Sequence, residues 1–504
     1  MSNVSIGERR PAEKGFVRNF LGVSAGNYGA IGLSFALNVV LTWRLGAEQF
    51  GRLALLIMAV QVLASVIFNW THTGLIRFGA QEFAKSGSVA ESFWSRMVVI
   101  SPWLLAATLG LAAVQDWASA YFGVSVAGIW LVFGYFFLSS LLLSFGGVFQ
   151  ACQQMDRYAV TLFLDKAGAL VGVLLLPASY AQDPVAVVGC YAASSLLVSA
   201  WAIAKLGRLL APAHASRAAI GSMWTFSIPL IVSTWVGLIG TQWINYAIIK
   251  YYLSFSDLGL YSLASQVAGV AQQVTIISSS LLLPHFAVLV SRRQQEEIRR
   301  QVERVVPYGL LGFALLLSVG VLAAKVGLPL VFGPSFTGAV QPLILLLVAS
   351  MGLALFNTFM PLISAYGETW VLTGITLASA LVNLAGTLLL VPSYGINGAA
   401  LATVLTYGSA AAFMLAVVQR RLGLPILRFA ALGLPVVVVA LCGALLDDLL
   451  GFYLAGLAGL VVSTYVLVVT FGLFGRGDMA ELARMDMPVL VKSGLTKVFS
   501  AKAG

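Results

Sequence analysis

The chain has 504 residues, of which 60% are hydrophobic and 10% charged, and its mean hydropathy is +0.94. This composition excludes a water-soluble monomer and indicates a polytopic membrane protein. The formal net charge of +10 does not indicate a nucleic-acid partner, because the basic residues are scattered between apolar spans. The three cysteines, at 152, 190 and 442, lie too far apart in sequence to indicate a disulfide framework or a zinc site.

The chain begins with a polar, basic segment, 1–19, and then becomes apolar. The first apolar run is too long for a signal-peptide core and has no small-residue cleavage site, so we expect it to remain as a span. At about 20 residues per span, the hydropathy pattern predicts fourteen transmembrane helices. They lie near 20–43, 53–72, 97–115, 126–150, 160–180, 185–204, 223–249, 258–289, 305–323, 338–360, 370–391, 397–418, 429–446 and 452–474.

Two similar phrases indicate an internal repeat. LGAEQFGRLAL at 45–55 follows the first helix, and LSFSDLGLYSL at 253–263 follows the seventh; the two align on Gly51 and Gly259. Weak symmetry of this kind is typical of transporters. We therefore expect an all-α membrane protein with two pseudo-symmetric six-helix lobes and about two extra C-terminal helices. The expected domains are a first lobe at 1–204, a cationic cytoplasmic linker at 205–219, a second lobe at 220–419, helices thirteen and fourteen at 420–475 and a cytoplasmic tail at 476–504.

The distribution of lysine and arginine predicts the orientation of these helices. If the N-terminus is cytoplasmic, 25 of the 29 basic residues fall in internal segments. This asymmetry follows the positive-inside rule and places both termini in the cytoplasm. The external loops are short, which argues against a membrane glycosyltransferase or polymerase with an external catalytic loop. Four basic residues are then external: Arg44, Arg52, Lys250 and Lys325.

Asp165 and Lys166 are the charges that reach the bilayer edge least easily. In a helix at 160–180 they lie roughly 8 Å inside the inner end. Lysine can extend to the interface from that depth, whereas an aspartate in hydrocarbon is costly unless it faces water or a partner. Adjacent residues point about 100° apart on a helix, so the two need not pair. Each either faces a cavity or lies at the interface.

The remaining candidate substrate-binding residues fall into two groups. Arg44 and Lys250 occupy equivalent outer positions in the two lobes and Arg77 an inner one; they either attract an anionic headgroup or anchor at the interface. Six polar residues within spans either line a hydrated sugar path or link helices by hydrogen bonds. These are Asn38, Gln61, Gln242, Asn245, Gln266 and Gln273. The three histidines show no ligand spacing, and no metal site or cofactor is indicated.

Several of these phrases resemble a known family. LGAEQFGRLAL, SDLGLYSLAS at 256–265, LVFG at 330–333 and VPSYGINGAALAT at 391–403 are similar to sequences of the polysaccharide transporter family in the MOP flippase superfamily. These are the O-antigen and exopolysaccharide repeat-unit flippases. The resemblance covers most of residues 16–420.

The resemblance implies a non-enzymatic flippase in the bacterial inner membrane. Such a protein carries a polyprenyl-pyrophosphate-linked oligosaccharide from the cytoplasmic to the external leaflet by alternating access. Membrane lipids and the polysaccharide polymerase machinery are the further partners expected. Lipid II transport is less well supported, because the first helix lacks the arginines that lipid II flippases carry there. Asn245 stands where many relatives have an acid. The alternative is a cation-coupled exporter of small amphiphiles like those of the MATE family, which normally needs acids embedded in the membrane.

Overall fold

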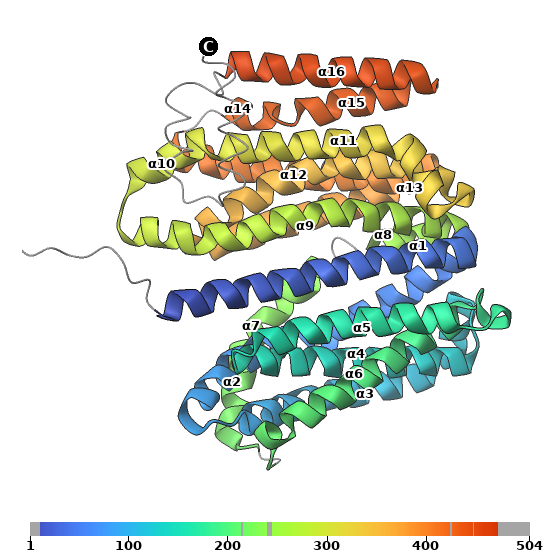
Figure 1. The fold of residues 1–504 in the computed structure, drawn as a ribbon, viewed down its shortest axis with the longest axis vertical. Coiled ribbons are helices and arrows are strands. Elements are labelled where there is room, and N and C mark those ends of the chain that lie inside the picture. Colours follow the sequence, from blue (N-terminus) through green and yellow to red (C-terminus); the bar gives the residue numbers. More distant parts are fainter. Residues whose placement is uncertain (1–10, 213–214, 239–243, 424–425, 447, 472–504) are drawn as a thin grey trace, which may run out of the picture. The chain divides into compact units, whose positions relative to one another are not determined.

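The computed structural model describes residues 11–212, 215–238, 244–423, 426–446 and 448–471, and these residues form helices without any strand (Figure 1). The longer helices are α1 (Pro11–Ile67), α2 (His72–Ser86), α3 (Ala90–Phe122), α4 (Val126–Ala151), α5 (Met155–Leu175), α6 (Pro184–Leu210), α7 (Arg217–Leu238), α9 (Phe255–Ser291), α11 (Val306–Phe332), α12 (Val340–Ala365), α13 (Thr369–Leu422) and α16 (Leu449–Thr470). The shorter ones are η1 (Asn69–Thr71), η2 (Ala178–Tyr180), α8 (Ile244–Tyr252), α10 (Gln295–Arg304), η4 (Pro334–Ala339), α14 (Ile426–Ala431) and α15 (Leu434–Leu445).

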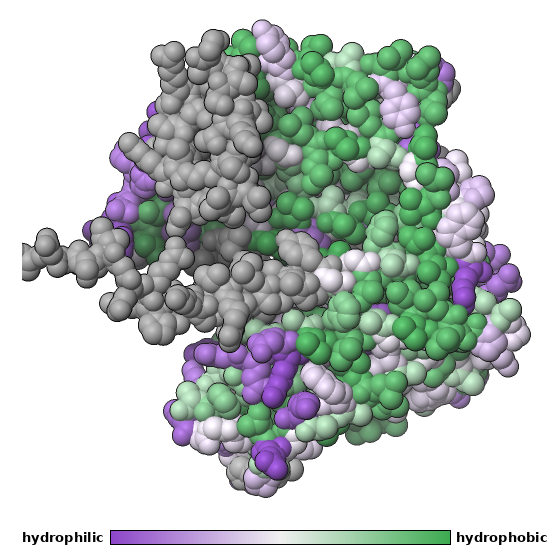
Figure 2. Space-filling model, viewed as in Figure 1, coloured by the Kyte–Doolittle hydropathy of each residue, from purple (hydrophilic) through white to green (hydrophobic). Residues whose placement is uncertain are grey.

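The helices have the length and the surface of membrane spans. Nine helices among the described residues are long and apolar enough to cross a bilayer. Large aliphatic side chains such as Leu389 and Val461 are 73% and 66% exposed, and Figure 2 shows apolar residues over much of the visible surface. Because water cannot solvate such a surface favourably, the exposed aliphatic groups indicate contact with lipid.

The expected all-α polytopic architecture is confirmed, and each of the fourteen expected spans overlaps a helix. The count remains approximate because several helices join or divide spans. α1 and α13 each contain two expected spans, joined at glycines whose backbone is not helical: Gly46 has φ 67° and Gly395 has φ 57°. Glycine adopts positive φ at little steric cost, so each span can end and the next begin within one residue.

The chain divides into two compact units by its contacts. The first comprises residues 1–263, 327–339 and 383–399, and the second comprises 264–326, 340–382 and 400–504. In the first unit α5 packs along α1 and against α6, and α6 packs against α4 (Figure 1). In the second unit α16 packs on α15, which packs on α12. The division into two lobes, a linker and a terminal helix pair stays a prediction.

The two related phrases cross one another inside the first unit. A Cβ added to Gly51 of α1 would lie 1.9 Å from the carbonyl oxygen of Phe255, and one added to Gly259 of α9 would lie 2.0 Å from the carbonyl oxygen of Ala47. The contact is reciprocal, since each glycine faces the residue four positions before the other. The repeat that the sequence suggests therefore marks a close helix crossing, which no larger side chain fits.

Candidate functional site

Asp165 lies at the midpoint of α5. It is ten residues from Met155 and ten from Leu175, which places it about 15 Å from either end of the helix. The expected bounds of 160–180 are wrong by five residues, because the helix is Met155–Leu175. Leu176 is extended because the residue before a proline is driven out of the helical region, and Pro177 therefore stops the helix early.

Asp165 and Lys166 form an ion pair despite being neighbours on one helix. The Lys166 Nζ atom lies 3.1 Å from Asp165 Oδ2. The other carboxylate oxygen accepts a hydrogen bond of 2.7 Å from the Ser195 hydroxyl of α6, and the Ser194 hydroxyl donates to the Asp165 carbonyl at 2.7 Å. The structure thus brings together two predicted residues whose pairing the sequence left open.

The two partners differ in exposure. The side chain of Asp165 is 16% exposed and that of Lys166 is 39% exposed. A four-carbon stem cannot cover the roughly 13 Å from Lys166 to the nearer end of α5. The ammonium therefore stays near the middle of α5, and at the middle of a span an ionised group needs a polar partner or hydrated surroundings. Mid-membrane charges with this property are characteristic of substrate and ion sites in transporters.

The neighbouring helices supply a polar wall to this pair. Tyr135 of α4 and Tyr191 of α6 pack with ring centroids 5.8 Å apart, and both interact electrostatically with Asp165. Close approach of α6 depends on Gly168, where an added Cβ would meet the Ser194 hydroxyl at 2.4 Å. The sequence analysis missed both tyrosines and both serines, because their membership depends on which helices pack against α5.

Arg44 of α1 lies at the C-terminal end of α5. Its guanidinium donates to the carbonyl oxygens of Val173 and Leu174 at 2.5 and 3.2 Å. These are among the last carbonyls of α5, which lack partners within the helix. Arg44 therefore caps α5 in this structure, and its contact with a headgroup stays a prediction.

The other two predicted cations lie over aromatic rings. The guanidinium carbon of Arg77 is 4.6 Å from the ring centre of Phe226 and 5.5 Å from that of Phe78. The Lys250 Nζ atom is 3.9 Å from the ring centre of Phe255. Such contacts stabilise a cation without neutralising it, so the geometry leaves both charges available to an anion.

The polar candidates belong to both compact units of the chain. Asn245 is buried, receives a hydrogen bond from Thr387 at 2.9 Å and donates one to Tyr261 at 2.9 Å. This geometry fits a link between helices. Asn38 and Gln273 are half-buried, Gln61 and Gln266 are exposed, and Gln242 lies outside the described residues.

Arg96 of α3 is a buried charge whose burial the sequence analysis did not foresee. It is 0% exposed, and its guanidinium donates to the Thr71 hydroxyl at 2.8 Å and to the Phe68 carbonyl at 3.0 Å. These contacts lie at the bend between α1 and α2. Arg96 lies close to the start of an apolar run, where basic residues commonly anchor at the membrane interface. Its position in the sequence therefore did not indicate that it is buried.

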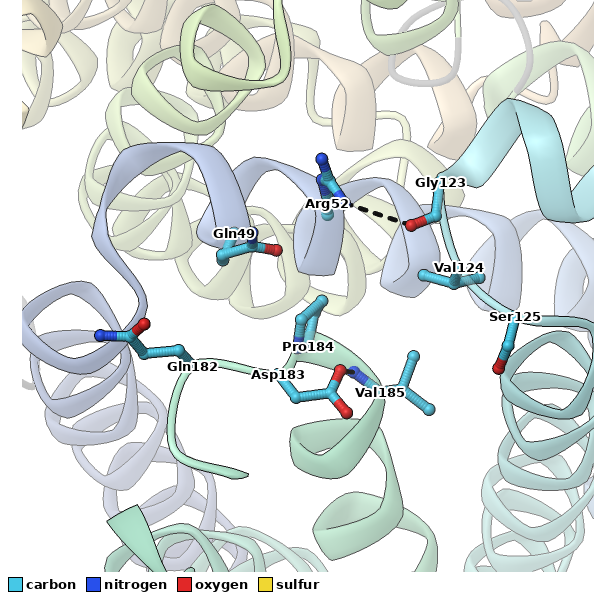
Figure 3. Close-up of a pocket in the computed structure, with 9 residues that line it drawn as sticks. All are labelled: Gln49, Arg52, Gly123, Val124, Ser125, Gln182, Asp183, Pro184 and Val185. Atoms are coloured by element: carbon cyan, nitrogen blue, oxygen red, sulfur yellow. Dashed lines mark hydrogen bonds between the residues drawn. The ribbon is translucent and has the colours of Figure 1, made fainter. Parts of the chain in front are cut away.

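A separate polar pocket of about 350 Å³ lies in the first unit (Figure 3). The Arg52 guanidinium at its edge donates to the carbonyl of Gly123 and to Glu48. None of the candidate site residues lines it. The lining residues are Gln49, Arg52, Gly123, Val124, Ser125, Gln182, Asp183, Pro184 and Val185. Across the described part of the chain, no group of histidine, cysteine and acidic residues is arranged to hold a metal ion.

The apolar helical surface, together with helices long enough to cross a bilayer, defines an integral membrane protein. Residues 16–290, more than half of the chain, match the family described as polysaccharide biosynthesis protein. The chain belongs to this family, which confirms the resemblance seen in the sequence. The matched region contains α5 and all the residues around Asp165.

Two curated relatives carry related names. The chain is 25% identical over 238 residues to the probable low-salt glycan biosynthesis flippase Agl15 of Haloferax volcanii. The aligned residues make up 47% of this chain and 50% of that protein. It is 26% identical over 362 residues to the succinoglycan biosynthesis transport protein ExoT of Rhizobium meliloti, 68% of each chain. The chain thus spans about half of the first relative and about two thirds of the second.

Solved structures share the fold. A lipid II flippase, MurJ, in an inward closed conformation aligns with a TM-score of 0.64 at 11% identity, over 89% of this chain and 99% of that one. An inward-facing multidrug resistance transporter of the MATE family, in the MOP superfamily, aligns with a TM-score of 0.60 at 13% identity, over 78% and 94%. At these identities the likeness concerns the fold alone.

Proposed function

We propose that this protein is a flippase for a polyprenyl-pyrophosphate-linked oligosaccharide. It carries the repeat unit of a surface polysaccharide, such as an O-antigen or exopolysaccharide, from the cytoplasmic to the external leaflet by alternating access. The family membership supports the substrate class, and both curated relatives are named for glycan biosynthesis. The observation that carries the proposal for this chain is the position of Lys166, a half-buried cation paired with Asp165 at the middle of α5.

The geometry suits an anionic headgroup. An ammonium has three donors, and among the described residues the hydrogen bond of Lys166 goes to Asp165. Its other donors can bind phosphate oxygens at the depth where transporters bind their substrates. Polar side chains such as Asn38 and Gln61 would contact the sugars, while the prenyl chain stays in lipid.

The proposal includes an orientation. The protein lies in the cytoplasmic membrane with both termini in the cytoplasm, as the positive-inside distribution predicts. A pyrophosphate with about two negative charges then gains roughly 4–5 kcal/mol per 100 mV on moving outward through the whole field. The polysaccharide polymerase machinery is the expected recipient of the flipped unit.

The second candidate is an exporter of small cations, which the shared fold with the MATE transporter favours. Export of a cation would need a net acidic site. The acid described at the middle of α5 is already paired with Lys166, so this pair offers no net negative charge to a cationic substrate.

The test is the appearance of lipid-linked oligosaccharide on the external leaflet of cells or vesicles. We expect deletion to trap it inside, and Lys166→Gln to lower the rate at least tenfold at normal protein level. Arg157→Gln removes an exposed cation from the start of the same helix and should change the rate less than twofold. If the lipid-linked sugar crosses at the normal rate without the protein, and small cations accumulate in the cell instead, the exporter function replaces the flippase.

A further inference from the structure

The polar pocket of Figure 3 is built from three segments of the first unit. Gln49 and Arg52 belong to α1, residues 123–125 form the turn before α4, and residues 182–185 lead into α6. The volume of about 350 Å³ falls within the range of roughly 300–1,000 Å³ that is usual for small-molecule sites. The proposed orientation of the chain places all three segments on the external side.

Two glutamine side chains line this pocket and lack a hydrogen-bond partner among the described residues. They are Gln49, which is half-buried, and Gln182, which is exposed. Burial of an amide costs free energy unless another group pairs with it. Each amide has a carbonyl oxygen that accepts and N–H groups that donate. The pocket therefore offers both donors and acceptors to a molecule that fills it.

Arg52 adds further donors at the edge of the pocket. Its guanidinium donates to the Gly123 carbonyl at 3.2 Å and to Glu48 at 2.8 Å, and its central carbon lies 4.9 Å from the ring centre of Phe255. A guanidinium has five N–H donors, so these two bonds leave one further N–H on each terminal nitrogen. The three contacts hold the side chain in place, and a ligand thus meets donors that are already ordered.

The charges around the pocket favour a neutral ligand over an anion. The N-termini of α4 and α6 would attract a phosphate, but Ser125 and Asp183 already cap them. Their side-chain oxygens accept hydrogen bonds of 3.1 and 2.9 Å from backbone N–H groups in the first turn of each helix. The Asp183 carboxylate also repels an anion, and Glu48 offsets the charge of Arg52. A neutral molecule rich in hydroxyl groups fits better, because each hydroxyl both donates and accepts.

We propose that this pocket binds a neutral sugar residue of the translocated oligosaccharide at the external surface. This rests on the proposed function. The amides of Gln49 and Gln182 bind the hydroxyl groups, and the apolar lining residues Val124, Pro184 and Val185 pack on the C–H face of the ring. Because the contact forms only after the sugar has crossed, it shifts the equilibrium of translocation outward.

The experiment measures binding of a soluble probe to the full-length protein in nanodiscs by calorimetry. The probe is the free oligosaccharide that mild acid releases from the lipid-linked repeat unit of the cells that make this protein. We expect Gln49→Leu and Gln182→Leu each to weaken binding at least fivefold, since leucine has a similar size but no hydrogen-bonding group. Gln81→Leu makes the same change on the exposed surface of α2 and should bind as wild type does.

Gln182→Leu keeps the experiment decisive if Gln49→Leu does not fold, because Gln182 is exposed in a turn. No binding of the oligosaccharide to wild type at millimolar concentration, or equal binding by wild type and both variants, overturns the inference. Inorganic pyrophosphate is the second probe, and we expect neither variant to change its binding. If both variants weaken it, the pocket is an anion site instead.

The same variants separate this inference from the proposed function. If oligosaccharide binding depends on the two glutamines, yet lipid-linked sugar crosses normally without the protein, the sugar site stands and the flippase function fails. If transport requires the protein while both variants bind the sugar normally, the flippase function stands and the sugar site fails.

Discussion

Arg96 is a charged residue whose side chain has no exposed surface. Its two acceptors do not depend on it, because the Thr71 hydroxyl already donates to the Phe68 carbonyl at 2.8 Å. Removing a buried ion of this kind leaves no acceptor unpaired and abolishes its desolvation cost. We therefore expect Arg96→Met to melt at the wild-type temperature or above it. Arg96→Ala opens a cavity and should lose about 3–5 kcal/mol.

Thermal unfolding in detergent checks this prediction. The exposed Arg208 provides the control, and Arg208→Met and Arg208→Ala should both melt within about a degree of wild type. A methionine variant that unfolds as early as the alanine variant would show that the guanidinium itself holds the bend between α1 and α2.

His72 makes the same region sensitive to acid. Burial, and secondarily the charge of Arg96, lowers the pKa of His72 from 6.5 to about 4. The folded state therefore favours the neutral ring. Its contribution to stability is complete above pH 6.5 and is lost as the pH falls from 6.5 toward 4, by about 3 kcal/mol at most.

The measurement is the melting temperature of wild type and of His72→Gln between pH 7.5 and 4. Wild type should lose more stability over this range than the glutamine variant, because only the histidine binds a proton on unfolding. Parallel curves for the two proteins would exclude His72 as the source of acid sensitivity.

At the scale of helices, the crossing of α1 and α9 depends on the absence of side chains. Gly51→Ala places a methyl group within 1.9 Å of the Phe255 carbonyl, so the two helices must separate. We expect a loss of about 1–3 kcal/mol or more. Gly32→Ala is the control on the same helix, where nothing lies within 4 Å. It should instead raise stability by about 0.5–1 kcal/mol, because alanine favours the helix. Loss of stability in both variants, measured by thermal unfolding, would contradict the steric explanation.

Helix boundaries show the limit of hydropathy alone. The apolar run after Val160 extends past Leu175, so counting about 20 residues predicted a helix that ends near Tyr180. Pro177 and the extended Leu176 end it earlier, and polar residues from Met155 onward extend its start. A shift of five residues moves Asp165 from about 8 Å inside one end of the helix to the midpoint of the helix.

For the whole molecule, the sequence was enough to predict the helical class, the positions of the spans and the family. These three features depend on apolar runs and on short local motifs, and both can be recognised directly in the sequence. The composition of the site could not be predicted, because Tyr135, Tyr191 and Ser195 reach Asp165 only through the packing of α4, α5 and α6. Arg44 likewise was recognised as a charge at a helix end, but the structure was needed to show that it caps α5.

The predicted orientation of the molecule can be measured by cysteine labelling. In a background without the three native cysteines, Gln182→Cys places an exposed thiol in the turn before α6, and Lys85→Cys places one in the last turn of α2. The positive-inside distribution predicts that a membrane-impermeant maleimide labels the first in intact cells and the second only after permeabilisation. The reverse pattern would invert the proposed direction of transport.

The sequence adjacency of Asp165 and Lys166 bears on how the protein is made. Charges supplied by two distant helices would have to enter the bilayer separately and unpaired. Here both partners belong to α5 and lie 3.1 Å apart, so the pair forms as soon as that helix does. α5 can thus leave the translocon with no net charge at its centre, before α4 and α6 have packed around it.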